Sequence, residues 1–408
     1  MTPRNCALDA VQWNDRRAYR LSNANVELTA LVGGGHIADF RLRGSPLNVL
    51  WESPWPTIEP QTFSSRRHAA LYGDGPVGRF LCGYTGHALA LGYFGMPSAE
   101  EAERGMSLHG EAANSEWKVV SAVADDDSAT LVLEVTLPVY RLHLRREISL
   151  SREAFTACIA ETVTNLSNTT VEFQWVQHAA FGEPFFASGE ATLFVSGKRG
   201  VTWPAGYEGH EILANDLEYQ WPYAQSIDGE AINLSQPFVR DGTGFVAALL
   251  LDSDRENAFV AVHNRRHQLV AGYSFNPLLF PWLAVWEENR ARAYAPWNKR
   301  TRVRGVEFGT SPMPLGLAHD RKMRRLFDTP VLSSVSASAS LQAQYDLFVH
   351  PAPPEWSQIK NVLQTEHTLV VRGDNDRGDN DRGDNNRGDN NQEDSDEAIN
   401  LQRGKRRP

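Results

Sequence analysis

Cysteine is scarce in this chain, and its few cysteines are poorly placed for cross-linking. The 408 residues include three cysteines, Cys6, Cys82 and Cys158, which lie far apart and are odd in number. Disulfide-stapled secreted domains and cysteine-based zinc sites need more cysteines at closer spacing. We therefore expect neither kind of site, and we expect a cytoplasmic protein in a reducing compartment.

Long apolar runs and an excess of basic residues are also missing. No apolar run approaches the roughly 18 residues that suggest a membrane-spanning helix. The first twenty residues are polar and lack the charged-then-apolar pattern of a secretory signal. The formal net charge is −10, whereas a protein that binds nucleic acid needs a basic surface. We expect no membrane and no nucleic-acid partner, and the oligomeric state stays open.

The C-terminal part of the chain differs in composition from the rest. A five-residue unit containing Arg-Gly-Asp-Asn begins at Arg372 and is followed by three further copies. Residues 371–408 contain no aromatic side chain and few aliphatic ones, so they cannot bury enough surface to offset chain entropy. We expect one domain over residues 1–350, a linker over 351–370 and a disordered repeat tail over 371–408. The Arg-Gly-Asp triplets are interpreted as repeat expansion, because an adhesion role would need an extracellular protein.

Short strand signals dominate the remainder of the chain. Thr130–Leu137 and Tyr140–Leu150 alternate apolar with polar residues across a break at Pro138, as two paired strands would. Only Ser98–Gly105 and His319–Phe327 look helical. With no repeat period of about 20 to 50 residues, this pattern predicts an all-β, mainly antiparallel sandwich of two large sheets. The other predicted strands are Ala154–Val163, Val171–Val176, Gly244–Leu251, Ala258–Val262 and Ser338–Phe348.

Three segments combine ionisable residues with the glycine or proline that lets backbone approach a ligand. His109 precedes a glycine in the first segment, and the run that starts at Glu161 leads to His178 in the second. In the third segment Glu307 stands between two apolar residues. Alternate side chains of a strand point to opposite faces, so Glu307 is expected to face solvent or a polar cleft. The segments cover residues 105–111, 161–182 and 305–312.

Taken together, these segments resemble the galactose mutarotase-like superfamily, the aldose 1-epimerases and their relatives. The resemblance runs from about Leu31 to Leu317 and keeps the order of the family's motifs. His109 with Gly110 is similar to the family's His-Gly motif, and Glu161-Thr-Val-Thr-Asn followed by His178 is similar to its Glu-Thr-x-Thr-Asn strand and second histidine. Val306-Glu307 resembles the strand that carries the catalytic carboxylate. The resemblance implies a large two-sheet β-sandwich with few short helices and an aldose 1-epimerase (mutarotase)-like activity.

The chemistry of that activity suits the residue types in these segments. Interconversion of the anomers of an aldose removes a proton from the C1 hydroxyl and delivers one to the ring oxygen, for which a carboxylate and an imidazole are a suitable base and acid. The resemblance implies Glu307 as base, His178 as acid and His109 as a hydrogen-bond partner of the sugar. No cofactor or metal is needed for such proton transfer. Arg79 is the candidate for the family's substrate-contacting arginine, while the segment Asn276–Trp297 departs from the family's pattern and suggests a divergent branch.

Several further residues are candidates for binding the sugar. Tryptophan rings stack on the apolar face of a pyranose. The candidates are Trp51, Trp55, Trp286 and Trp297, although plain core packing is the more common role of such residues. Trp55 stands between two prolines, which favours a loop. His87 is interpreted either as a buried structural histidine or as a ligand-facing one.

Two other functions remain open from the sequence. One is a non-catalytic carbohydrate-binding or regulatory protein on the same fold, which the tryptophan-rich segment 276–297 favours. The other is a metal-dependent sugar enzyme, in which His109, His178 and Glu307 would form an open zinc or manganese site. These three residues lie far apart in the sequence, which makes a metal site the weaker hypothesis. All three hypotheses share a small-molecule sugar as the partner.

Overall fold

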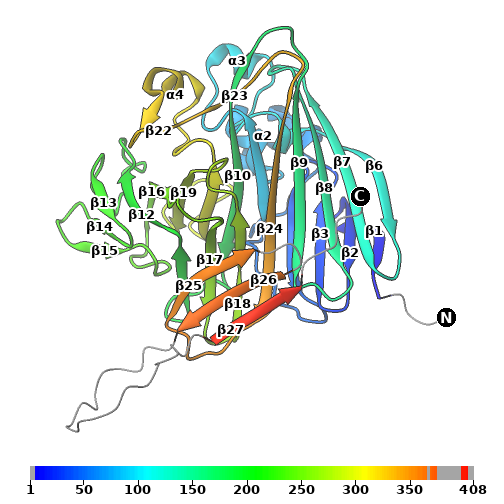
Figure 1. Cartoon of the computed structure of the whole chain (residues 1–408). Coiled ribbons are helices and arrows are strands. Elements are labelled where there is room, and N and C mark those ends of the chain that lie inside the picture. The colour runs from blue at the N-terminus through cyan, green and yellow to red at the C-terminus, as the bar shows by residue number, and fades with distance from the viewer. Residues whose placement is uncertain (1–4, 365–367, 375–396, 403–408) are drawn as a thin grey trace.

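The computed structural model describes residues 5–364, 368–374 and 397–402. About half of them form antiparallel strands that build two large stacked sheets, with a smaller third sheet on the outside (Figure 1). This confirms the predicted all-β sandwich. No helix in these ranges is long and apolar enough to cross a membrane.

The larger sheet contains fourteen strands and provides the floor of the candidate site. Its central strands are long and lie in the order β5, β10, β20, β19 and β16, each antiparallel to its neighbour. Its strands, in spatial order, are β1 (Ala7–Trp13), β2 (Arg16–Ser22), β3 (Val26–Leu31), β4 (Ile37–Leu42), β5 (His87–Gly92), β10 (Val171–Gly182), β20 (Arg302–Gly309), β19 (Trp282–Asn289), β16 (Thr243–Leu251), β12 (Gly197–Thr202), β13 (Glu218–Gln220), β14 (Tyr223–Gln225) and β15 (Ala231–Asn233), with β23 (Ser333–Val335) pairing the start of β10.

The second sheet has eight strands and supplies the other half of the core. In β8 the side chains of Leu142, Leu144 and Ile148 point inward, while the alternate residues His143, Arg145 and Glu147 are less buried. This alternation is the pattern by which the strand was predicted. The strands, in spatial order, are β11 (Ala191–Val195), β17 (Ala258–Asn264), β18 (Leu269–Phe275), β24 (Ser340–Pro351), β9 (Thr156–Asn165), β8 (Leu142–Ser151), β7 (Ser128–Leu137) and β6 (Lys118–Ala124).

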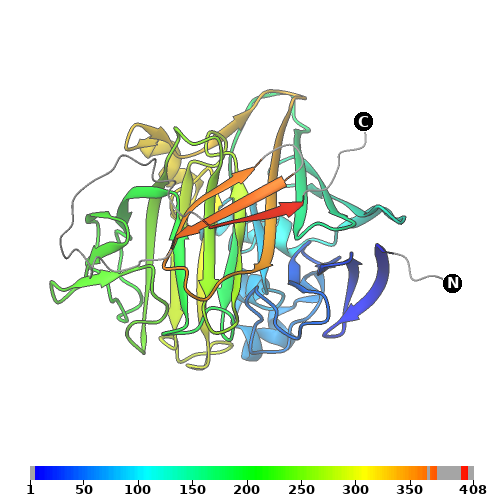
Figure 2. The ribbon, with the colours of Figure 1, turned by 60° about the horizontal axis from the view of Figure 1, so that its bottom comes forward.

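A three-stranded sheet follows the sandwich and corrects the predicted C-terminal boundaries. It consists of β25 (Gln358–Gln364), β26 (Thr368–Asp374) and β27 (Glu397–Gln402). Trp356, Ile359 and Leu369 of this region pack with Phe259 and Phe348 of the second sheet, and Figure 2 shows the three strands lying across that sheet. The predicted linker over 351–370 is therefore wrong, and so is a tail that starts at 371. Residues 375–396, which include most of the repeat, lie outside the described residues.

The helices are short and lie in the connections between strands. The predicted helix at Ser98–Gly105 is observed as α3 (Ala99–Glu103), which Ser98 and Glu101 cap reciprocally. The predicted helix at His319–Phe327 is shorter than expected, because Arg324 takes a left-handed conformation (φ 64°) and ends it. The remaining elements are η1 (Pro60–Thr62), α1 (Ser65–Tyr72), α2 (Gly75–Leu81), η2 (Ala112–Asn114), α4 (Leu317–Met323), β21 (Arg325–Leu326) and β22 (Thr329–Pro330).

Candidate active site

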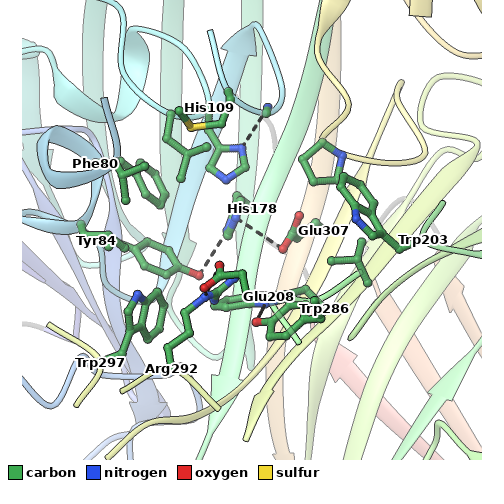
Figure 3. A pocket seen from close by; sticks show the side chains of 18 of the residues that line it. Phe80, Tyr84, His109, His178, Trp203, Glu208, Trp286, Arg292, Trp297 and Glu307 are labelled. Carbon is green, nitrogen blue, oxygen red and sulfur yellow. Dashed lines mark hydrogen bonds and ion pairs between the residues drawn. The ribbon is translucent and has the colours of Figure 1, made fainter. Parts of the chain in front are cut away.

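A cavity of about 380 Å³ lies on the face of the large sheet that points away from the second sheet. Strands β10, β20 and β19 form its floor, and α2 with several loops forms its walls (Figure 3). The volume is within the range of roughly 300 to 1,000 Å³ that is typical of small-molecule pockets. The described residues that line it are Val77, Phe80, Leu81, Tyr84, Gly95, Met96, Leu108, His109, His178, Trp203, Gly206, Tyr207, Glu208, Val246, Trp286, Arg292, Tyr294, Trp297, Glu307 and Pro314.

Strand register brings His178 and Glu307 together in the floor of the cavity. His178 of β10 is directly opposite Glu307 of β20, and side chains opposite each other in an antiparallel pair are close neighbours. The next residues in the same row are Ala88 of β5 and Ala284 of β19. Because these flanking side chains are small, the two ionisable groups stand at the bottom of an open space.

Gly305 makes room for the glutamate. It lies two residues before Glu307 on β20 and therefore on the same face of the strand. A Cβ atom at Gly305 would stand 2.5 Å from Glu307 Oε1 and 3.0 Å from the ring of Trp286. The carboxylate thus occupies the space in which any other residue would place its side chain.

Tyr84, His178 and Glu307 lie in one row, with the imidazole between the phenol and the carboxylate. His178 Nε2 is 3.3 Å from Glu307 Oε1, and the Tyr84 hydroxyl is 3.2 Å from the other ring nitrogen, Nδ1. Phe80 stacks on the Tyr84 ring at 4.8 Å between centroids and fixes its orientation. A phenol hydroxyl that donates to Nδ1 leaves the proton of a neutral imidazole on Nε2, where it faces Glu307.

His109 approaches the same point from the opposite wall. It takes a left-handed conformation (φ 64°) in the turn before Gly110, and its ring centroid lies 4.7 Å from that of His178. The backbone N–H of Gly95 donates to His109 Nδ1 at 3.3 Å. That bond makes Nδ1 an acceptor, so a neutral His109 carries its proton on Nε2.

Burial shifts the proton affinities of all three groups. It lowers the pKa of His178 to about 4. It also holds the pKa of His109 well below its ordinary value, with the neighbouring His178 as a second cause. Burial raises the pKa of Glu307 well above that of an exposed carboxyl. Both imidazoles are therefore neutral near pH 7, and Glu307 exchanges its proton at a higher pH than an ordinary carboxylate.

Aromatic side chains make up much of the wall. Trp286 donates its indole N–H to the Tyr207 hydroxyl at 2.7 Å, and Trp297 meets Trp286 edge to face at 5.9 Å between centroids. Trp286 and Trp297 were named from the sequence, whereas Trp203, Tyr207 and Tyr84 were not. A buried ring and a cavity-lining ring have the same sequence signal, so only the fold separates them.

Four of the residues proposed from the sequence lie outside the cavity lining, namely Trp51, Trp55, His87 and Arg79. Trp55 is buried behind the wall, donates its indole N–H to the Leu81 carbonyl and packs edge to face on Trp297. His87 points into the core, because it precedes Ala88 on β5 and the two side chains take opposite faces. It hydrogen-bonds there to Gln177 and Tyr273. Arg79 is on the side of α2 that does not line the cavity, although Phe80 of the same helix does.

The arginine that lines the cavity is Arg292, within the segment that departs from the family's pattern. Its Nε donates to Glu208 at 3.0 Å and its Nη1 to the buried Glu288 at 3.2 Å. The guanidinium also lies over the rings of Tyr207 and Trp297, at 4.5 and 5.2 Å. Four arginines stand between residues 290 and 302, and nothing in the sequence distinguishes this one.

Glu161 of the Glu-Thr-x-Thr-Asn run serves the core and not the cavity. Its carboxylate pairs with the fully buried Arg146 at 2.6 Å and accepts hydrogen bonds from Trp175 and Gln177 of β10. Trp175 and Gln177 point to the core side of β10, whereas His178, the residue after Gln177, points to the cavity. The run therefore holds β10 against the second sheet and fixes the floor of the cavity from behind.

The cavity fits no metal among the described side chains. No three His, Cys, Asp or Glu residues in the described ranges are grouped closely enough to hold a metal ion. The arrangement of Tyr84, His109, His178 and Glu307 instead provides proton donors and acceptors around one space.

Comparisons with known proteins give a fold but no close relative. No family model matches the chain, and no curated protein matches it. A putative aldose 1-epimerase from Klebsiella pneumoniae is similar with a TM-score of 0.60 and 16% identity, over 86% of this chain and 84% of that one. A galactose mutarotase-like protein from Clostridium acetobutylicum has a TM-score of 0.57 and 13% identity, over 85% and 99%. These likenesses establish the galactose mutarotase-like sandwich fold.

Proposed function

We propose that this protein is an aldose 1-epimerase-like isomerase that interconverts the anomers of a small sugar by general acid–base catalysis. The observation that carries the proposal is the convergence of His109, His178 and Glu307 in one cavity, although they come from three distant parts of the chain. The cavity is lined with tryptophan and tyrosine rings, which suit the apolar face of a pyranose. The fold shared with structures described as epimerases and mutarotases agrees with it.

In the proposed reaction Glu307 removes the proton of the C1 hydroxyl, and the neutral His178 delivers its Nε2 proton to the ring oxygen and becomes an imidazolate beside the Tyr84 hydroxyl. The C1–O5 bond then breaks, and the open-chain aldehyde turns about its C1–C2 bond. Reversal of the two proton transfers closes the other anomer and restores both side chains. His109 donates from Nε2 to a sugar oxygen and holds the ring in place. The two anomers have the same composition and the same oxidation state, so the proposed reaction needs no cofactor.

A protein that binds sugar without turnover is the second candidate. The burial of Glu307 favours it, because a raised pKa leaves part of the carboxyl protonated and unable to act as a base. The same cavity and the same rings would serve binding alone.

Polarimetry separates the two candidates. Freshly dissolved α-anomers of a panel of aldoses would be followed with and without the protein, and binding of each sugar would be measured in parallel by calorimetry. Acceleration of mutarotation supports the isomerase. Binding without acceleration supports the carbohydrate-binding protein, and no binding of any aldose removes both. We place either activity in the cytoplasm, in keeping with three cysteines that lie far apart in the sequence.

A further inference from the structure

We infer that Glu208 is a specificity-determining residue, which closes the cavity to sugars that carry a phosphate or carboxylate group. The inference rests on the proposed function and adds the charge class of the substrate. Glu208 does so by neutralising Arg292, the one cationic side chain among the described residues of the cavity lining apart from histidines.

The charges of the lining favour an uncharged ligand. Its acidic residues are Glu208 and Glu307, and burial keeps both histidines neutral near pH 7. Arg292 is already shared between Glu208 and the buried Glu288. An anionic group that entered this space would pay a desolvation penalty and would be repelled by the carboxylates. No unpaired cation of the lining would offset these costs.

Arg292 is held as part of the wall. Its Nε contacts Glu208 Oε1, its Nη1 contacts Glu288 Oε2, and its guanidinium is covered by the Tyr207 and Trp297 rings. Its side chain is only 16% exposed. A phosphate could gain this arginine only by displacing a carboxylate from it.

Glu208 is the accessible member of this cluster. Its side chain is 47% exposed, whereas that of Glu288 is fully buried and also accepts two backbone N–H groups. The Tyr294 hydroxyl lies 3.1 and 2.9 Å from the two Glu208 oxygens and donates to the carboxylate. Glu208 sits in a left-handed turn before Gly209 (φ 56°), and Figure 3 shows it beside Arg292 at the cavity. It therefore combines contact with the arginine and contact with solvent in the cavity mouth.

Calorimetry with matched sugar pairs tests this assignment. Glucose and galactose would each be compared with their 6-phosphates, on the wild-type protein and on Glu208→Gln, at fixed pH and salt. The substituted glutamine keeps the size of the side chain and the hydrogen bond from Tyr294 but frees Arg292 from one negative charge. We expect the wild type to prefer the uncharged sugar by about tenfold or more, the size of a like-charge penalty. In the variant the phosphorylated sugar should gain about tenfold in affinity while the uncharged one changes little.

Two further variants control the result. Glu218→Gln removes a carboxylate from an exposed arginine pair outside the cavity lining and should change neither affinity. The double variant Glu208→Gln/Arg292→Gln should lose the gain for phosphorylated sugars. Wild-type binding of a 6-phosphate as tight as that of its parent sugar would overturn the inference and leave the proposed function standing. So would a folded Glu208→Gln variant with unchanged affinity for phosphates. No binding of any aldose would instead remove the proposed function, and this inference with it.

Discussion

At the scale of single residues, the candidate site takes its reactive groups from distant parts of the chain. His109, His178 and Glu307 stand out because each belongs to a short motif, and the structure brings the three together. Tyr84 carries no motif, and it joins the row only because β5 follows a turn that sets its hydroxyl against His178. Residues that depend on such a contact cannot be chosen from the sequence alone.

Glu307→Gln tests the role of the base. The amide keeps the shape of the side chain but cannot take a proton, so turnover of a cognate aldose should fall by roughly 100- to 10,000-fold, with little change in binding. Polarimetry and calorimetry measure the two effects, and Glu218→Gln is a control for loss of charge elsewhere. A wild-type rate in Glu307→Gln would contradict the assignment.

The pH profile provides an independent test of the same group. The base acts only as a carboxylate, and burial raises its pKa above the ordinary 4.5. Turnover per bound sugar should therefore rise with pH along a limb whose midpoint lies well above 4.5. An activity that is already constant from about pH 5 upward would exclude Glu307 as the titrating base.

Tyr84→Phe examines the orientation of His178. Loss of the hydroxyl removes the partner of Nδ1, so the ring proton should divide between the two nitrogens. We expect turnover to fall by about tenfold, the equivalent of one hydrogen bond, while the melting temperature stays nearly constant. Nitrogen-15 shifts of His178 report the proton position directly, and an unchanged Nε2–H form in the variant would refute this role.

At the scale of elements, strand patterns were predictable and their ends were not. β7 and β8 were recognised because their alternation reflects one buried face. β10 was predicted to end at Val176 but continues to Gly182, since both of its faces are buried and it has no alternation to follow. His178 therefore stands on a strand and not in a loop. The sequence does not predict helices α1 and α2, because seven or eight residues leave a weak signal and α2 also contains two glycines and a proline.

Gly305→Ala tests how β20 seats the reactive carboxylate. The added methyl group would overlap Glu307 Oε1, so the side chain must move away from His178. We expect turnover to fall by a factor close to that of Glu307→Gln, although every reactive group is retained. Thermal unfolding should show a much smaller effect. Full activity in this variant would mean that the space left by Gly305 is not required for the position of Glu307.

At the scale of the whole molecule, composition misplaced the end of the folded chain. Residues 371–408 include only a few aliphatic side chains and were expected to be disordered. Val371 at their start is nevertheless buried, together with Leu369 just before it, against Trp356 and the second sheet. The composition of a segment indicates how much apolar surface the segment can bury by itself. The third sheet instead covers apolar side chains that belong to the second sheet, such as Phe259 and Phe348. A segment that completes another unit's core needs little apolar content of its own.

Two deletions distinguish the third sheet from the repeat. Deletion of 371–408 removes β27 and the second part of β26, and it uncovers Ile359 and Val362. At roughly 1.5 to 3 kcal/mol for each large side chain, unfolding should become easier by at least about 3 kcal/mol. Replacement of residues 375–396 by Asn-Gly keeps both strands and should leave stability unchanged. Equal stability of the two deletion variants in urea unfolding would contradict the docking of this sheet.

The pairing of Gly373 with Glu397 places the two ends of the segment that contains the repeat on neighbouring strands of one sheet. That sheet covers the second sheet of the sandwich, while the cavity opens on the far side of the first. The cost of closing a loop grows only with the logarithm of its length, so one more five-residue unit adds about 0.2 kcal/mol. Copy number can therefore drift from one lineage to the next as a neutral length polymorphism, and homologues that differ in it should share the same catalytic constants.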